Sequence, residues 1–183
     1  MNKLLSGFDM NKYKNQKPPK DNSLTTFKEL KEINSLREDP SFVKEKDNQV
    51  SAFKKIAAKN GLPFPKDLVN SLIDETAPKV LDLKNHFNRP RPKHLAGSFG
   101  MKLKDVKMDS MKTPSYPSGH SVQGFLIGSY LSDKYPRSRK ALMTTGKNIS
   151  YSRRVARAHY KSDSKMGEKL GNSMYKHIKN KTK

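Results

Sequence analysis

The chain has 183 residues, which is enough for one compact domain and too short for two large ones. It contains no cysteine, which excludes disulfides, thiolate zinc sites and a cysteine nucleophile, and no apolar run is long enough to span a bilayer. The net charge of +21 favours an anionic partner, such as a phosphorylated substrate, nucleic acid or a membrane surface, although a lysine-rich proteome explains it equally well. The lysines are spread along the whole chain, which weakens the nucleic-acid interpretation.

Residues 1–22 are rich in lysine, asparagine and proline and predict an extended basic N-terminal arm, followed by a single domain over residues 23–183. The N-terminus lacks the uninterrupted apolar core of a secretory signal. We therefore expect a cytoplasmic or phage-associated protein with no transmembrane segment.

Apolar residues then recur with helical spacing along most of the chain. Ser23 is a natural N-cap for a first helix, and Asp39-Pro40 ends that helix or begins a turn. Further helices are predicted over about 50–60, 66–87, 118–131, 137–159 and 162–179, with residues 88–115 mostly in loops. No segment alternates apolar and polar residues as a strand would. The sequence therefore predicts an all-α fold, a single helical bundle of about six main helices.

The first segment with candidate chemistry runs from Lys84 to Pro92. Pro90 and Pro92 disfavour helical geometry at the residues before them, so Arg91 is expected on a stiff extended loop. Such a loop can hold a guanidinium in one direction, where its paired donors match a phosphate. On its own, this segment is better explained as an ordinary basic helix end.

The second segment, Tyr116-Pro117-Ser118-Gly119-His120, predicts the start of a helix. Ser118 is a natural N-cap, and Gly119 lets an anion approach the backbone closely. Free N–H groups at a helix N-terminus favour phosphate, and His120 would lie beside it in the first turn. The alternative is a capped helix with an incidental histidine.

The third segment contains Arg153, His159 and Asp163. A carboxylate that accepts a hydrogen bond from one imidazole nitrogen leaves the other nitrogen free as a nucleophile. The spacing of His159 and Asp163 fits one helical turn, or a helix end followed by the N-cap region of the next helix. Arg153, nearly two helical turns before His159, can face the same pocket. On its own, the segment is better explained as a surface pair on a basic helix.

Together the three segments resemble the signature of the type 2 phosphatidic acid phosphatase superfamily, which includes class A bacterial nonspecific acid phosphatases and vanadium-dependent haloperoxidases. The signature reads Lys84-x6-Arg91-Pro92, then Pro117-Ser118-Gly119-His120, then Ser152-Arg153-x5-His159-x3-Asp163. Tyr116 and the run from Ala158 to Asp163 are most similar to the soluble acid phosphatases.

This resemblance implies a metal-independent phosphomonoesterase that acts on a small, soluble phosphate ester. His159 would attack phosphorus and form a phosphohistidine, Asp163 would orient His159, and His120 would protonate the leaving oxygen and then activate water. The residues that would surround the phosphoryl oxygens are Lys84, Arg91, Ser118, Gly119 and Arg153. The resemblance implies no metal and no cofactor, with vanadate as an inhibitor that mimics the transition state.

Alternatives remain at this stage. Vanadium haloperoxidases use the same oxyanion cradle, but the short chain and the phosphatase-like flanks argue against one. A phosphatidate-type lipid phosphatase would require the basic surface to bring the protein to a membrane. A non-catalytic nucleic-acid-binding or virion-associated protein could keep the fold as a scaffold, which the intact signature disfavours. The substrate, the oligomeric state (a homo-oligomer included) and binding of nucleic acid stay open.

Overall fold

Helices make up the regular structure of the chain. A computed structural model describes residues 3–104 and 108–182, and within these ranges it contains α-helices and short 3-10 helices but no strand. The predicted all-α fold is therefore confirmed. The α-helices are α1 Leu24–Ser35, α2 Pro40–Asp47, α3 Gln49–Lys59, α4 Lys66–Phe87, α5 Pro92–Ala96, α6 Gly119–Lys134, α7 Arg139–Val155 and α8 Lys161–Lys181. Among these described helices, none is both long and apolar enough to cross a membrane.

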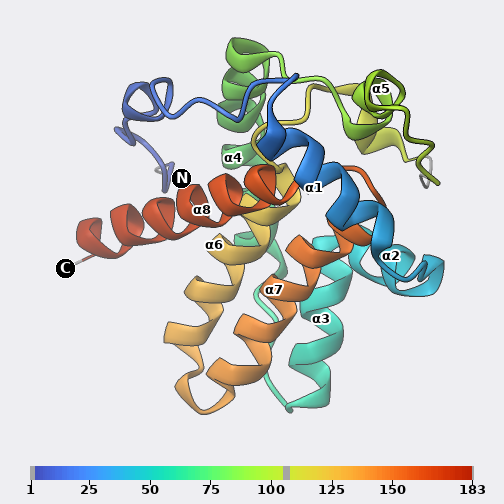
Figure 1. Cartoon of the computed structure of the whole chain (residues 1–183). Coiled ribbons are helices and arrows are strands. Elements are labelled where there is room, and N and C mark those ends of the chain that lie inside the picture. The colour runs from blue at the N-terminus through green and yellow to red at the C-terminus, as the bar shows by residue number, and fades with distance from the viewer. Residues whose placement is uncertain (1–2, 105–107, 183) are drawn as a thin grey trace.

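Helix α6 lies at the centre of the bundle. Figure 1 shows α6 and α7 as an antiparallel hairpin, with α8 crossing the upper part of α6. Glycines allow this close packing, because a Cβ atom added at Gly146 would lie 2.4 Å from the backbone oxygen of Gly124, and one added at Gly171 would lie 2.4 Å from that of Val122. The starts of α6 and α8 are joined directly, since the backbone N–H of Ser118 donates to the carbonyl of Asp163 at 3.1 Å. The second and third sequence segments therefore meet at this end of the bundle.

The N-terminal segment is folded against the rest of the chain. It contains a 3-10 helix, Asn11–Tyr13, and its apolar residues Leu5, Phe8 and Tyr13 are buried in the main core. The carboxylate of Glu75 on α4 accepts hydrogen bonds from two backbone N–H groups of this segment. Because these apolar side chains are buried, the N-terminal segment packs against the domain, where the sequence predicts an extended arm. The domain boundary at residue 22 stays a prediction.

Local chemistry explains where several helices begin. The side chain of Ser23 accepts from the backbone N–H of Thr26 at the start of α1, as the sequence predicts. Two short helices differ from the prediction. Asp39-Pro40 starts α2 instead of a turn, because the Asp39 carboxylate caps the helix and Pro40 occupies its first turn. Helix α5 lies within the segment predicted as loop, so the described ranges hold more helices than the six predicted.

The predicted helix over 137–159 is wrong at its C-terminal end, because α7 stops at Val155. Arg157 adopts a left-handed conformation with φ of 56°. The Ala158 N–H then donates to the Arg153 carbonyl at 3.0 Å, and the Arg157 N–H donates to the Arg154 carbonyl at 2.9 Å, which is the Schellman pattern of helix ends. His159 therefore lies in the connector before α8, the second of the two placements that the sequence leaves open.

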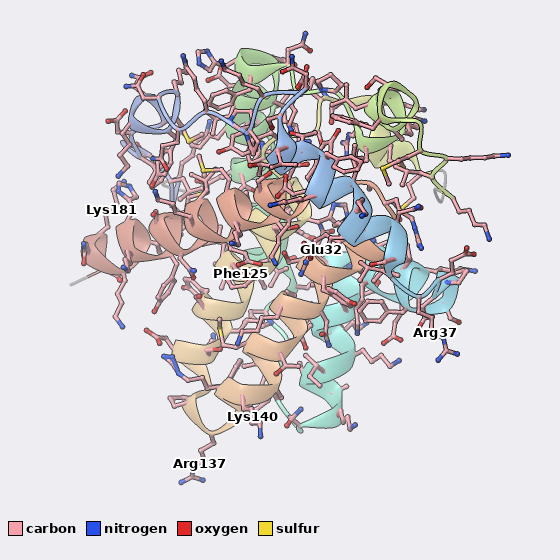
Figure 2. The ribbon with its side chains drawn as sticks, in the orientation of Figure 1. Glu32, Arg37, Phe125, Arg137, Lys140 and Lys181 are labelled. Carbon is pink, nitrogen blue, oxygen red and sulfur yellow. The ribbon has the colours of Figure 1, made fainter. Side chains whose placement is uncertain are left out.

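Basic side chains surround the molecule. Figure 2 shows the exposed Arg37, Arg137 and Lys181 at widely separated places, after α1, between α6 and α7, and at the end of α8. The charge is therefore distributed over the surface as it is along the sequence.

Candidate active site

A pocket of about 280 Å³ lies between α4, the start of α6 and the α7–α8 connector. Five residues that the sequence analysis selects line it: Lys84, Arg91, Gly119, His120 and His159. The remaining lining residues are Ala77, Val80, Leu81, Thr113 and Gln123. Residues from all three sequence segments thus meet at one cavity.

His159 forms a buried pair with Asp163. Its Nδ1 lies 3.1 Å from Asp163 Oδ2, and the two side chains are 4% and 0% exposed. On the other side of the ring, Nε2 lies 3.0 Å from Arg91 Nη1. A guanidinium can only donate, so Nε2 must offer a lone pair, and the proton of a neutral ring is on Nδ1, facing Asp163. Burial first, and then the charge of Arg91, hold the pKa of His159 well below its usual value of 6.5.

Asp163 is held as a carboxylate by several donors. Arg89 Nη1 lies 2.7 Å from Oδ1, the Tyr160 backbone N–H donates to Oδ2 at 3.0 Å, and the Ser115 hydroxyl donates to Oδ2 as well. Burial alone would raise the pKa of Asp163, but the hydrogen bond with His159 and the charge of Arg89 outweigh it and hold the pKa well below the usual range. Asp163 therefore stays ionised behind His159.

Lys84 and Arg91 bring positive charge to the lining of the pocket. Lys84 is buried and its Nζ donates to the Pro114 carbonyl at 2.6 Å. Burial, followed by the charge of Arg91, lowers the pKa of Lys84 to about 7. Arg91 is oriented by the Thr113 carbonyl, 2.8 Å from Nε, and by the Ala158 carbonyl, 2.9 Å from Nη1. Two carbonyl groups thus fix the direction in which this guanidinium points.

His120 and Arg153 share a partner, Asp47, which is the last residue of α2. His120 Nε2 lies 2.9 Å from the Asp47 backbone oxygen and 3.4 Å from its Oδ1, while Arg153 Nη1 lies 2.8 Å from the same Oδ1. Arg153 also donates to the Val43 carbonyl at 3.3 Å. The sequence predicts Arg153 in the pocket, but the residue is buried and is not among those that line it.

A sequence model of the PAP2 superfamily matches residues 68–178 of the chain, a range that contains all three segments. The chain belongs to the PAP2 superfamily. This finding confirms the predicted resemblance to the type 2 phosphatidic acid phosphatases, and membership implies phosphatase-type activity. Of the eight candidate site residues predicted from the sequence, five line the pocket, and Asp163 lies directly behind His159.

Ser118 has a structural part in this PAP2 site. Its hydroxyl accepts from the Ser121 backbone N–H at 3.3 Å and from the Ser121 hydroxyl at 3.0 Å, which caps α6. Ser118 is fully buried and lies outside the pocket lining, whereas the neighbouring Gly119 lines it. Direct contact of Ser118 with a phosphate stays a prediction.

Three polar residues near the PAP2 pocket were missed by sequence reasoning. Asp47 gave no signal, because it lies 73 and 106 positions from the residues it contacts. Ser115 stands only three residues before Ser118, but nothing in the pattern separates it from other loop serines. Arg89 had a signal in the repeated Arg-Pro of residues 89–92, and its buried guanidinium also stacks on Tyr160 with its Cζ atom 3.8 Å from the ring centroid.

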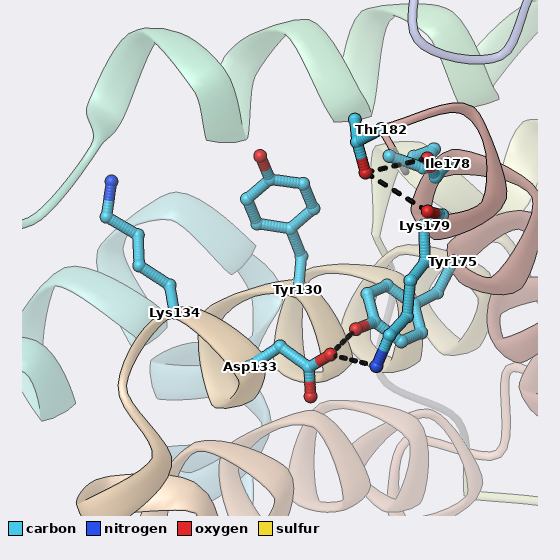
Figure 3. Close-up of a pocket in the computed structure, with 7 residues that line it drawn as sticks. All are labelled: Tyr130, Asp133, Lys134, Tyr175, Ile178, Lys179 and Thr182. Atoms are coloured by element: carbon cyan, nitrogen blue, oxygen red, sulfur yellow. Dashed lines mark hydrogen bonds and ion pairs between the residues drawn. The ribbon is translucent and has the colours of Figure 1, made fainter.

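A second pocket lies between the ends of α6 and α8 (Figure 3). Its carboxylate, Asp133, is already paired with Lys179 at 2.6 Å and with the Tyr175 hydroxyl. The charges of Asp133 and Lys179 therefore neutralise each other. Across the described parts of the chain, no group of three or more His, Asp or Glu side chains is placed to hold a metal ion.

Proposed function

We propose that the chain is a phosphomonoesterase that works without a metal ion through a phosphohistidine on His159. One observation carries this proposal: the unprotonated Nε2 of His159, backed by Asp163, lies in a pocket that Lys84, Arg91 and His120 also line. A nucleophile, cationic groups and a second titratable ring therefore surround one space.

In the first step, His159 Nε2 attacks phosphorus while the bond from phosphorus to the ester oxygen breaks. His120 starts protonated and gives its proton to that oxygen, so an alcohol leaves and a phosphohistidine remains. The neutral His120 then takes a proton from water, whose oxygen attacks phosphorus as the bond to Nε2 breaks. Phosphate leaves, and both histidines return to their starting states.

The positive charges explain how this chemistry proceeds without a divalent ion. Negative charge is spread over the phosphoryl oxygens in the transition state, and fixed cations stabilise it strongly in a site from which water is excluded. Arg91 is fixed by two carbonyl groups, and Lys84 becomes fully charged when an anion binds beside it. The free N–H groups at the start of α6, next to Gly119, add neutral donors.

We further propose a small, soluble phosphate ester as the substrate. The pocket volume of about 280 Å³ suits a phosphoryl group with a small leaving group. One wall is apolar and formed by Ala77, Val80 and Leu81 from α4.

The test is a panel of p-nitrophenyl phosphate, nucleotides, sugar phosphates and phosphatidic acid, assayed with the wild type and with His159→Ala. We expect turnover of small soluble esters that EDTA leaves unchanged, and an acid-labile phosphoenzyme that His159→Ala cannot form. The control is His94→Ala, because His94 is exposed on α5. Labelling of His159→Ala would move the nucleophile elsewhere, and turnover of phosphatidic acid alone would change the substrate class.

A further inference from the structure

The contact between His120 and Asp47 determines which ring nitrogen of His120 carries a proton. His120 Nε2 lies 2.9 Å from the backbone oxygen of Asp47, and a carbonyl oxygen can only accept a hydrogen bond. Nε2 must therefore be the donor. Nδ1 has no hydrogen-bond partner in the part of the chain that the structure describes, and His120 lines the pocket. Nδ1 is thus the nitrogen left to exchange a proton with a bound molecule.

The Asp47 carboxylate adds charge to this arrangement. Its Oδ1 lies 3.4 Å from His120 Nε2 and 2.8 Å from Arg153 Nη1, so one oxygen joins the ring on α6 to the guanidinium on α7. Lys84, Arg91 and His159 line the same pocket as the ring. Burial is the main influence that lowers the pKa of His120, Asp47 acts against it, and Arg153 lowers it further. Asp47 is therefore the one group among these that favours the protonated ring.

We propose that Asp47 is a positioning residue of the phosphatase reaction: it orients His120 so that Nδ1 delivers the proton to the leaving oxygen. This inference rests on the proposed function, in which His120 is the acid. The proton on Nδ1 passes to the ester oxygen as the bond from phosphorus to that oxygen breaks, while Nε2 keeps its proton toward Asp47. In the second step Nδ1 takes a proton from the attacking water.

In other enzymes an aspartate that accepts a hydrogen bond from a histidine orients the ring for acid–base catalysis. Here Asp47 contacts Nε2 through its backbone oxygen as well as its carboxylate. Asp47 ends α2, and Asn48 caps α3 immediately afterwards, so the backbone on both sides of the carboxylate is held by helices. The Asp47 side chain is half-exposed. The hydrogen bond with His120 and, less strongly, the charge of Arg153 lower the pKa of Asp47 to about 2. Asp47 is therefore ionised throughout the range in which an acid phosphatase works.

The experiment uses Asp47→Asn, which keeps the size of the side chain and the backbone carbonyl but removes the charge. General acid catalysis contributes about 10²–10⁴-fold, and its contribution grows as the leaving group becomes more basic. We expect Asp47→Asn to lower kcat/KM for an alkyl phosphate about tenfold or more, but for p-nitrophenyl phosphate by less than about threefold. The alkaline limb of the pH profile should move to lower pH, because His120 loses its proton earlier without the carboxylate.

Two further variants separate this role from a merely structural one. Glu45→Gln is the matched control, since Glu45 lies on the same helix and pairs only at the surface with Lys46 and Lys55 at 3.1 Å. In a His120→Ala background, Asp47→Asn should cause no additional loss, because its effect passes through the ring. Thermal unfolding checks that each variant is folded.

The inference would be overturned if Asp47→Asn lowered kcat/KM equally for both esters, weakened inhibition by phosphate and left the alkaline limb of the pH profile unchanged. Asp47 would then act by positioning Arg153 instead of His120. A further loss in the His120→Ala background would overturn it as well. These outcomes differ from failure of the proposed function, which would appear in the wild type as no phosphoenzyme or as a phosphoenzyme that persists in His159→Ala.

Discussion

Replacing Asp163 by Asn tests the buried centre of the site. The substitution removes the charge that keeps the proton of His159 on Nδ1, and an Asn side chain can present an N–H to that nitrogen instead. The nucleophilic Nε2 would then be protonated in the neutral ring. In enzymes where a carboxylate fixes the tautomer of a catalytic histidine, the same change lowers kcat about 10⁴-fold, and we expect a loss of about 10³–10⁴-fold here.

The structure also sets the cost in stability. Asp163 is fully buried, and its Oδ1 lies 2.7 Å from Arg89 Nη1. Breaking a buried ion pair from one side costs about 3–5 kcal/mol, because the other charge is left uncompensated. Arg89 keeps Glu29, whose Oε2 lies 3.4 Å away, so we expect the lower end, about 3 kcal/mol.

Rapid-quench measurement of the phosphoenzyme gives the rate of the first step, and urea unfolding gives the change in stability. Ser115→Ala is the matched control, since it removes one hydrogen bond to the same carboxylate and leaves the charge in place. We expect that control to keep kcat within about tenfold of the wild type. A folded Asp163→Asn protein with kcat equally close to the wild type would refute the assigned role of the pair.

Other predictions address charge, inhibition and packing. The Lys84 amine, followed by nuclear magnetic resonance in the ligand-free protein, should titrate near 7, and phosphate should raise that midpoint because binding favours the charged form. Since the unfolded chain holds this proton up to about 10.5, the contribution of Lys84 to stability should increase between those pH values. Vanadate should inhibit in competition with phosphate, and activity that depends on added metal would contradict the proposed mechanism. Gly146→Ala should lower the free energy of unfolding by about 1–3 kcal/mol, because its Cβ would meet the Gly124 backbone at 2.4 Å, whereas Gly97→Ala, with nothing within 4 Å, should cost far less.

Most helices could be predicted because their ends carry local signals. Ser23 and Ser118 cap α1 and α6, and both side chains make the expected contacts with the backbone three residues on. The end of α7 could not be predicted in the same way. Its left-handed residue is Arg157, where glycine is the usual choice. A long-range hydrogen bond from the guanidinium to the Leu36 carbonyl, at 2.6 Å, stabilises it.

The same contrast between local signals and long-range contacts holds for the candidate site. The three segments carry recognisable patterns, and the structure brings residues of each to one pocket. The partners of those residues have no pattern of their own. Asp47 reaches Arg153 across 106 positions of sequence, and Glu29 reaches Ser162 across 133, so only the packing of the helices makes these contacts visible.

The two histidines differ in a way that suits their proposed parts in the reaction. His159 and Asp163 are both buried, with side chains 4% and 0% exposed, and the charge of Arg91 beside Nε2 opposes protonation of the ring. His120 and Asp47 are more open, with side chains 15% and 49% exposed. A nucleophile must stay unprotonated through the working range of pH, whereas an acid that becomes a base must exchange a proton in every turnover. Arg91 beside Nε2 of His159 serves the first requirement, and Asp47, which favours the protonated form of His120 against the effect of burial, serves the second. The partners of the two rings therefore support the assignment of His159 as nucleophile and His120 as acid.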